Sequence, residues 1–191
     1  EQNDHAAGDS RRLFICNGGF LTRPRLRRIL QLAGWSLRIG LPGPGDHVGI
    51  WGDSPTAWRG KALAARRGAR LVRIEDAFLR SVLPGLARGP VAGRGPIGLL
   101  IDPSGLHFDP DTPSLIETLV HAPATQAQLD RARQGIARLI AADLSKYNAH
   151  LPQVAPPAGG YALVIDQTRG DASLRRAGQA DFRAMLEAAR D

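Results

Sequence analysis

Short apolar runs alternate with helical patterns along most of the chain. The apolar runs, bounded by glycine, proline or acidic residues, predict buried strands; they are Leu13–Cys16, Ser36–Ile39, Val48–Trp51, Leu71–Ile74, Ile97–Ile101 and Ala162–Ile165. Apolar residues at helical spacing predict helices between the strands; these are Pro24–Ala33, Ala57–Arg67, Leu115–His121, Gln126–Ala142 and Asp181–Arg190. Strands that alternate with helices are typical of an α/β fold with a parallel sheet and flanking helices.

A proline- and glycine-rich segment, residues 150–160, divides this pattern. Its sequence, HLPQVAPPAGG, predicts a linker. We therefore expect a disordered tail over 1–10, a Rossmann-like domain over 11–149, and the start of a second Rossmann-like domain over 161–191. One strand and one helix cannot bury their own apolar faces. Residues 161–191 must therefore join the first sheet or belong to a larger protein, and we favour the larger protein, with its second half truncated here.

The charge and composition narrow the class of partner. The net charge is +7, but the 25 basic residues are almost all arginine, are spread along the chain, and accompany only 5% aromatic residues. This distribution does not favour nucleic-acid binding and fits a modest attraction for anions. A single cysteine and the lack of an apolar run of membrane-spanning length predict a cytoplasmic protein. The five histidines lack metal-ligand spacing, so we expect neither a metal nor a cofactor.

Polar residues crowd onto the turn after the last predicted strand. Asp166, Gln167, Arg169, Asp171 and Ser173 follow it within eight positions. In open α/β folds ligands bind at the carboxyl ends of the strands. One interpretation is a helix cap and an Asx turn built by the acids. The other is a carboxylate nucleophile for glycosyl transfer through an oxocarbenium-like transition state.

Two further groups follow predicted strands. Glu75 and Asp76 precede Arg80, a pattern that usually means a solvated ion pair. At a strand end, however, both acids would share the sheet edge with Asp171, and Arg80 could hold a substrate carboxylate or phosphate. The turn at residues 52–56 contains Ser54 but lacks the glycine spacing and lysine of a phosphate-binding loop, and residues 17–19 form no dinucleotide fingerprint. We therefore exclude nicotinamide and ATP sites.

Several motifs, in order, resemble the KpsC/LipB-type capsule polysaccharide proteins over most of residues 12–191. They are the strand at 48–51 with its following turn, IEDAFLRS at 74–81, IGLLIDPSGLHFD at 97–109, DLSKYN at 143–148 and VIDQTRGDAS at 164–173. The resemblance implies bacterial retaining β-Kdo transferases built from GT-B-like pairs of Rossmann-type halves. Such enzymes transfer Kdo from CMP-Kdo to a lipid-linked, phosphatidylglycerol-based acceptor at the inner face of the cytoplasmic membrane.

The resemblance also implies residue roles. Asp171 matches the nucleophile of a double displacement. Glu75 and Asp76 match a segment that lines the family's active site, and Arg80 and Ser81 belong to the same segment. A last set of residues, predicted to position or bind substrate, comprises Ser54, Gln167, Arg169 and Ser173. The expected partners are CMP-Kdo, the lipid acceptor, other capsule assembly proteins and the anionic inner-membrane surface. Arg25, Arg27 and Arg28 could face that surface or could simply be solvated, which is the commoner case.

Two expectations concern the chain as a whole. A family module continues beyond residue 191 to a lysine-histidine-proline segment and further strands that hold the nucleotide. We therefore expect this chain alone to be inactive. The alternative function is a non-catalytic scaffold of the capsule assembly and export machinery, in which the acids serve only as caps.

Overall fold

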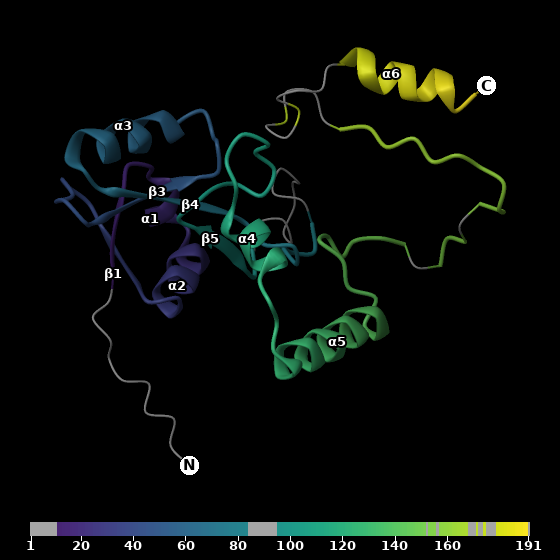
Figure 1. The fold of residues 1–191 in the computed structure, drawn as a ribbon, viewed down its shortest axis with the longest axis horizontal. Coiled ribbons are helices and arrows are strands. Elements are labelled where there is room, and N and C mark those ends of the chain that lie inside the picture. Colours follow the sequence, from purple (N-terminus) through teal and green to yellow (C-terminus); the bar gives the residue numbers. More distant parts are fainter. Residues whose placement is uncertain are drawn as a thin grey trace.

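The computed structural model describes residues 11–83, 95–151, 153–155, 157–167, 171, 174 and 179–190 (Figure 1). Its strands are β1 Arg11–Ile15, β2 Trp35–Arg38, β3 His47–Trp51, β4 Arg70–Asp76 and β5 Leu99–Asp102. Its helices are α1 Gly19–Thr22, α2 Pro24–Leu32, α3 Ala57–Arg67, α4 Leu115–His121, α5 Gln126–Ala141 and α6 Gln179–Ala188. None of the helices in this part of the chain is long and apolar enough to span a membrane.

The strands form one sheet in the order β2-β1-β3-β4-β5. The pairs β1–β2, β1–β3 and β3–β4 are parallel, which confirms the predicted Rossmann-like α/β fold. The prediction of an entirely parallel sheet is wrong for β5, which pairs with β4 in the antiparallel direction. Antiparallel neighbours need no crossover to the far side of the sheet, so the chain can return along the edge that it has just left.

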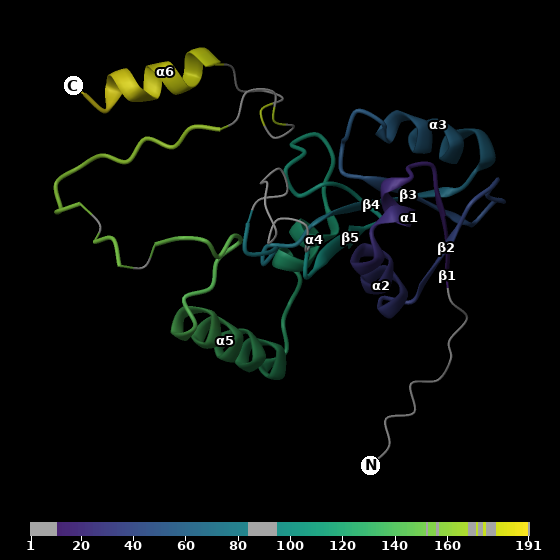
Figure 2. The ribbon, with the colours of Figure 1, turned by 180° about the vertical axis from the view of Figure 1, so that it is seen from behind.

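The two faces of the sheet carry separate cores. Leu13 and Ile15 of β1 face α1 and α2, where they pack with Phe20, Leu26 and Leu30. Between them in the chain, Phe14 points to the opposite face, where Val48 and Ala64 complete the core beneath α3. The alternation follows from the two-residue period of a strand. Figures 1 and 2 show α2 and α3 on opposite sides of the sheet.

Gly60 allows α3 to lie close to the sheet. A Cβ atom at this position would collide with the Ile50 side chain and touch that of Val48. The helix ends at Gly68, whose φ of 63° places it in the left-handed conformation that glycine adopts without steric cost. The close approach of α3 holds the turn that precedes it against the carboxyl end of β3.

The helices beyond β5 begin at well-formed caps. Ser114 and Glu117 form a reciprocal capping box on α4, and Thr125 and Gln128 form one on α5. Asp102, at the end of β5, accepts a hydrogen bond from the Leu115 amide at 2.8 Å and so ties α4 to the sheet. By contrast, α5 contains no buried residue, and both views show it standing apart from the sheet.

The predicted strand Ala162–Ile165 is wrong. Residues 161–167 have no regular secondary structure and pair with none of the five strands. Leu163 and Ile165 are 75% and 70% exposed. An apolar run becomes a strand only when a neighbouring strand satisfies its backbone and another layer covers its side chains. The residues that the structure describes supply neither to this segment. The division into domains at residues 150–160 stays a prediction.

Candidate active site

The carboxyl ends of three parallel strands meet at one edge of the sheet. Residues 16–19 follow β1, residues 52–56 follow β3, and β4 ends at Glu75 and Asp76. The strands are joined there, because the Gly52 amide donates a hydrogen bond to the Ile74 carbonyl at 2.8 Å. This edge is where open α/β sheets bind ligands. It therefore gathers Glu75 and Asp76, which were predicted to lie at a sheet edge, together with Ser54.

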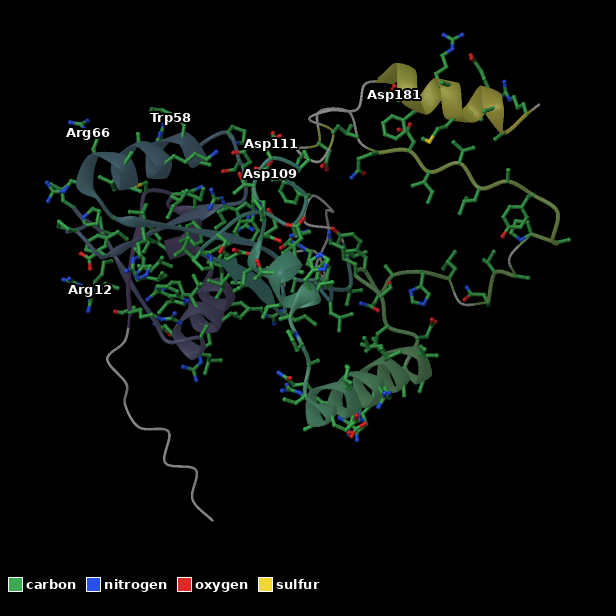
Figure 3. All side chains as sticks on the ribbon, viewed as in Figure 1. Arg12, Trp58, Arg66, Asp109, Asp111 and Asp181 are labelled. Atoms are coloured by element: carbon green, nitrogen blue, oxygen red, sulfur yellow. The ribbon has the colours of Figure 1, made fainter. Side chains whose placement is uncertain are left out.

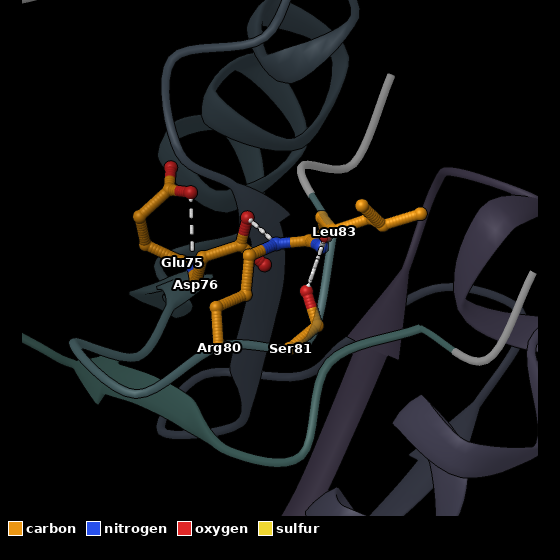
Figure 4. A network of polar contacts seen from close by, with 5 residues as sticks. All are labelled: Glu75, Asp76, Arg80, Ser81 and Leu83. Atoms are coloured by element: carbon orange, nitrogen blue, oxygen red, sulfur yellow. Dashed lines mark hydrogen bonds and ion pairs between the residues drawn. The ribbon is translucent and has the colours of Figure 1, made fainter. Parts of the chain in front are cut away.

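A buried ion pair organises the end of β4 (Figure 4). Nε of Arg80 donates to Oδ2 of Asp76, and Nη1 of Arg80 donates to Oγ of Ser81 at 2.9 Å. The Ser81 hydroxyl in turn donates to the Leu83 carbonyl at 2.6 Å. The Arg80 side chain is only 6% exposed, so the interpretation of a solvated surface pair is wrong. Because its guanidinium already binds Asp76 and Ser81, Arg80 orients these groups, and its predicted contact with substrate stays a prediction.

Segments far apart in the sequence meet at this ion pair. The amide of Arg80 donates to the Lys146 carbonyl at 3.1 Å, and the Asn148 side chain donates to the Ser81 carbonyl at 3.2 Å. The ring of Phe78 contacts that of His107 at 5.4 Å between centroids. The motifs at 74–81, 97–109 and 143–148, which the sequence presented separately, therefore build one structure.

Glu75 is held in a confined position beside the ion pair. Its Oε1 accepts a hydrogen bond from the Asp76 amide at 2.9 Å. Its Oε2 lies against Gly52, where a Cβ atom would collide with the carboxylate and where φ is 45°. Burial raises the pKa of Glu75 above its ordinary value of 4.5. The hydrogen bond from the Asp76 amide lowers this pKa, and the charge of the nearby Asp76 carboxylate raises it. Glu75 is thus suited to hold or accept a proton.

The raised pKa of Glu75 makes a pH-dependent contribution to stability. The folded protein keeps the Glu75 proton to a higher pH than the unfolded chain does. The stability from this proton is therefore fully present below pH 4.5 and is lost as the pH rises through the folded-state pKa. We expect the free energy of unfolding of Glu75→Gln to increase relative to that of the wild type as the pH rises from acidic to neutral, because only the wild type loses the contribution of this proton.

Urea denaturation at a series of pH values measures this difference. The matched control is Glu187→Gln, which replaces an exposed glutamate on α6. A difference between Glu75→Gln and the wild type that stays constant over the whole pH range would contradict the assignment.

The loops after β1 and β3 are bonded to each other. The side-chain Nδ2 of Asn17 donates to the Thr56 hydroxyl at 3.1 Å, and the side-chain Oδ1 of Asn17 accepts from the backbone amide of Gly19 at 2.9 Å. The Ser54 hydroxyl lies 3.4 Å from that of Thr56. Residues 17–19 form no dinucleotide fingerprint, so their sequence alone does not mark them as part of a site. Their importance follows from strand order, since β1 and β3 become neighbours only in the folded sheet.

The predicted site residues beyond position 160 do not follow a strand of the described sheet. Asp166 accepts a hydrogen bond from the Gln167 amide at 2.6 Å, and the carbonyl of Asp171 accepts one from the Leu174 amide at 3.0 Å. Asp171 is exposed, and the strand that was predicted to bring it to the sheet edge is not formed. Arg169 and Ser173 lie outside the described residues. Within the described ranges, no group of three or more metal-ligating side chains could hold a metal ion.

A family model described as capsule polysaccharide biosynthesis protein matches residues 46–156, more than half of the chain. The chain belongs to this family. The match begins just before β3, ends within the predicted linker, and includes the Asp76–Arg80 ion pair. The motif resemblance seen in the sequence is confirmed by this match.

Two individual relatives extend the comparison. The capsule polysaccharide modification protein LipA of Neisseria meningitidis serogroup A is 30% identical over 182 residues, which are 89% of this chain and 25% of LipA. The lipopolysaccharide-processing protein LpsZ of Rhizobium meliloti is 36% identical over 121 residues, 60% of this chain and 26% of LpsZ. This chain thus spans about a quarter of each relative's length.

The solved structure of Thermosulfurimonas dismutans KpsC, a β-Kdo 2,4 transferase, has the same fold. It superposes with a TM-score of 0.76 at 28% identity, covering 95% of this chain and 56% of the KpsC chain. A second KpsC structure, of the β-Kdo 2,7 transferase, gives a TM-score of 0.55 at 18% identity over 86% of this chain and 51% of that chain, and supports the fold alone.

Proposed function

We propose that this capsule polysaccharide biosynthesis protein is part of a glycosyltransferase that transfers Kdo from CMP-Kdo to a lipid-linked acceptor. The observation that carries the proposal is the likeness to the KpsC β-Kdo 2,4 transferase over 95% of the chain. The ordered carboxylates at the sheet edge support it, because sugar transfer through an oxocarbenium-like transition state requires carboxylates that can act as nucleophile or base.

The mechanism proposed is a double displacement that retains the anomeric configuration. A carboxylate oxygen of Asp171 bonds to the anomeric carbon of Kdo while the bond to the phosphate oxygen of CMP breaks. An acceptor hydroxyl then displaces Asp171 and loses its proton to a base. Glu75, with its raised pKa and fixed carboxylate, is our candidate for that base. Asp76 and Arg80 keep the end of β4 in place around it.

The complete activity belongs to a longer protein. The chain covers 56% of the KpsC structure, so we propose that the donor is bound partly by residues beyond this chain and that the chain alone is inactive. The partners proposed are CMP-Kdo, the phosphatidylglycerol-based acceptor, other capsule assembly proteins and the cytoplasmic face of the inner membrane. The exposed Arg25, Arg27 and Arg28 on α2 support the membrane contact, at about 1 kcal/mol for each arginine near an anionic surface.

A transfer assay tests the proposal. The full-length protein is incubated with CMP-Kdo and a synthetic Kdo-terminated lipid, and the lipid is analysed by mass spectrometry. We expect a mass gain of one Kdo residue, and NMR of the product should show the β-anomer. A non-catalytic scaffold would leave the lipid unchanged, which would reject the transferase function in favour of the interaction module.

A further inference from the structure

A pocket of about 210 Å³ opens at the same edge of the sheet, between the ends of β1 and β3. The chain passes from β1 to β2 on one side and later places β3 on the other, so the strand order reverses between β1 and β3. A reversal of this kind leaves a crevice at the carboxyl ends of the two strands, and ligands of open α/β sheets bind there. The pocket is lined by Asn17, Gly19, Phe20, Arg23, Leu26, Trp51 and Ser54.

The lining combines one cation, two hydrogen-bonding side chains and an apolar wall. Arg23 is the cation, and its guanidinium forms no ion pair with any residue that the structure describes. Two other basic groups near this edge are already paired: Lys61 binds Asp53 at 2.6 Å, and Arg80 binds Asp76. An arginine without a carboxylate partner at the rim of a pocket is available to an anionic ligand.

The walls of the pocket are fixed before any ligand binds. Phe20 and Leu26 are each 2% exposed and belong to the core under α2. The Phe20 ring contacts that of Trp51 at 6.2 Å between centroids. On the polar side, Asn17 bonds both the β1 loop and Thr56. A preformed site of this kind loses little entropy when it binds.

We propose that this pocket binds the anionic, hydroxylated end of the acceptor, with Arg23 on its acid group, Asn17 and Ser54 near its hydroxyls, and its carbon face on Trp51. The inference rests on the proposed function and names a site for the acceptor. The volume is below the range of about 300–1,000 Å³ that suits drug-sized ligands, so it matches a single sugar ring or headgroup. Both a sugar-acid carboxylate and a glycerol phosphate have the required chemistry.

The pocket is joined to the candidate base. Trp51 and Ser54 belong to the β3 end and its turn, and Gly52 between them lies against the Glu75 carboxylate. Trp51 packs against the core under α2, whereas Glu75 alternates with Ile74 and therefore faces the side of the sheet that α3 covers. The pocket and the candidate base are thus linked through the turn at Gly52.

The test measures binding without transfer. The full-length protein is titrated by calorimetry, in the absence of CMP-Kdo, with the methyl glycoside of Kdo, with glycerol 3-phosphate and with neutral methyl glucoside. Arg23→Gln is compared with the wild type and with Arg66→Gln, an exposed arginine that points away from the sheet on α3 (Figure 3). Ser54→Ala is a second pocket variant, and thermal melting checks that each variant is folded.

We expect at least one anion to bind, and Arg23→Gln to weaken it by about tenfold or more while Arg66→Gln does not. The anion that shows this dependence identifies the sugar acid or the glycerol phosphate as the recognised group. Equal affinity in wild type and Arg23→Gln, or equal binding of neutral methyl glucoside, would overturn the pocket assignment. Arg23-dependent binding without any Kdo transfer would retain the pocket and reject the proposed function.

Discussion

Replacing Asp171 by alanine in the full-length protein is expected to lower the rate of Kdo transfer by at least about 10³-fold, because the covalent step then has no nucleophile. The residue is exposed and follows the polar run that begins at Asp166. Intact mass spectrometry after incubation with CMP-Kdo alone should show a Kdo adduct on the wild type and none on Asp171→Ala. Asp130→Ala, which removes an exposed carboxylate from α5, is the matched control and should keep the adduct.

The possible results separate the parts of the mechanism. Transfer that continues in Asp171→Ala at close to the wild-type rate would remove Asp171 as the nucleophile while keeping the transferase. An adduct that survives the substitution would place the covalent bond on another residue. Because the strand predicted to bring Asp171 to the sheet edge is not formed, this experiment bears directly on whether Asp171 belongs to the same active site as Glu75.

The second large effect is expected on stability. Arg80→Met leaves the Asp76 carboxylate without its cation, although only 18% of that side chain is exposed and its Oδ1 is buried without a hydrogen-bond partner among the described residues. Breaking a buried ion pair by removing one partner costs about 3–5 kcal/mol. We expect a loss of about 3 kcal/mol in the free energy of unfolding, measured by urea denaturation.

Two comparisons make the Arg80 result specific. Arg133→Met breaks a pair with Asp130 whose side chains are 66% and 51% exposed, and should cost less than about 1 kcal/mol. The double variant Asp76→Asn/Arg80→Met removes the charge left behind and should recover part of the loss. If Arg80→Met and Arg133→Met destabilise equally, the Asp76–Arg80 pair does not organise the end of β4.

Local sequence determined several of the regular elements between residues 11 and 141. The predicted helices Ala57–Arg67 and Leu115–His121 have the bounds that the structure shows, since Gly68 ends the first and the Ser114–Glu117 capping box begins the second. Each signal acts within one turn of helix, so no distant residue is needed to interpret it. The strand ends that deliver Glu75, Asp76 and Ser54 to one edge were predictable for the same reason, together with the rule that parallel strands share a carboxyl edge.

Other features depended on which segments meet. The antiparallel direction of β5, the burial of Arg80 beside Asp76 and the pocket between Asn17 and Trp51 are contacts between distant positions, and neither apolar period nor motif spacing encodes them. The run at residues 162–165 shows the converse. Its branched residues have the composition of a buried strand, yet without a neighbouring strand they form none. Apolar pattern and motifs therefore limit which residues can form a sheet and a site. The folded arrangement selects among them, because backbone pairing and burial require a partner surface.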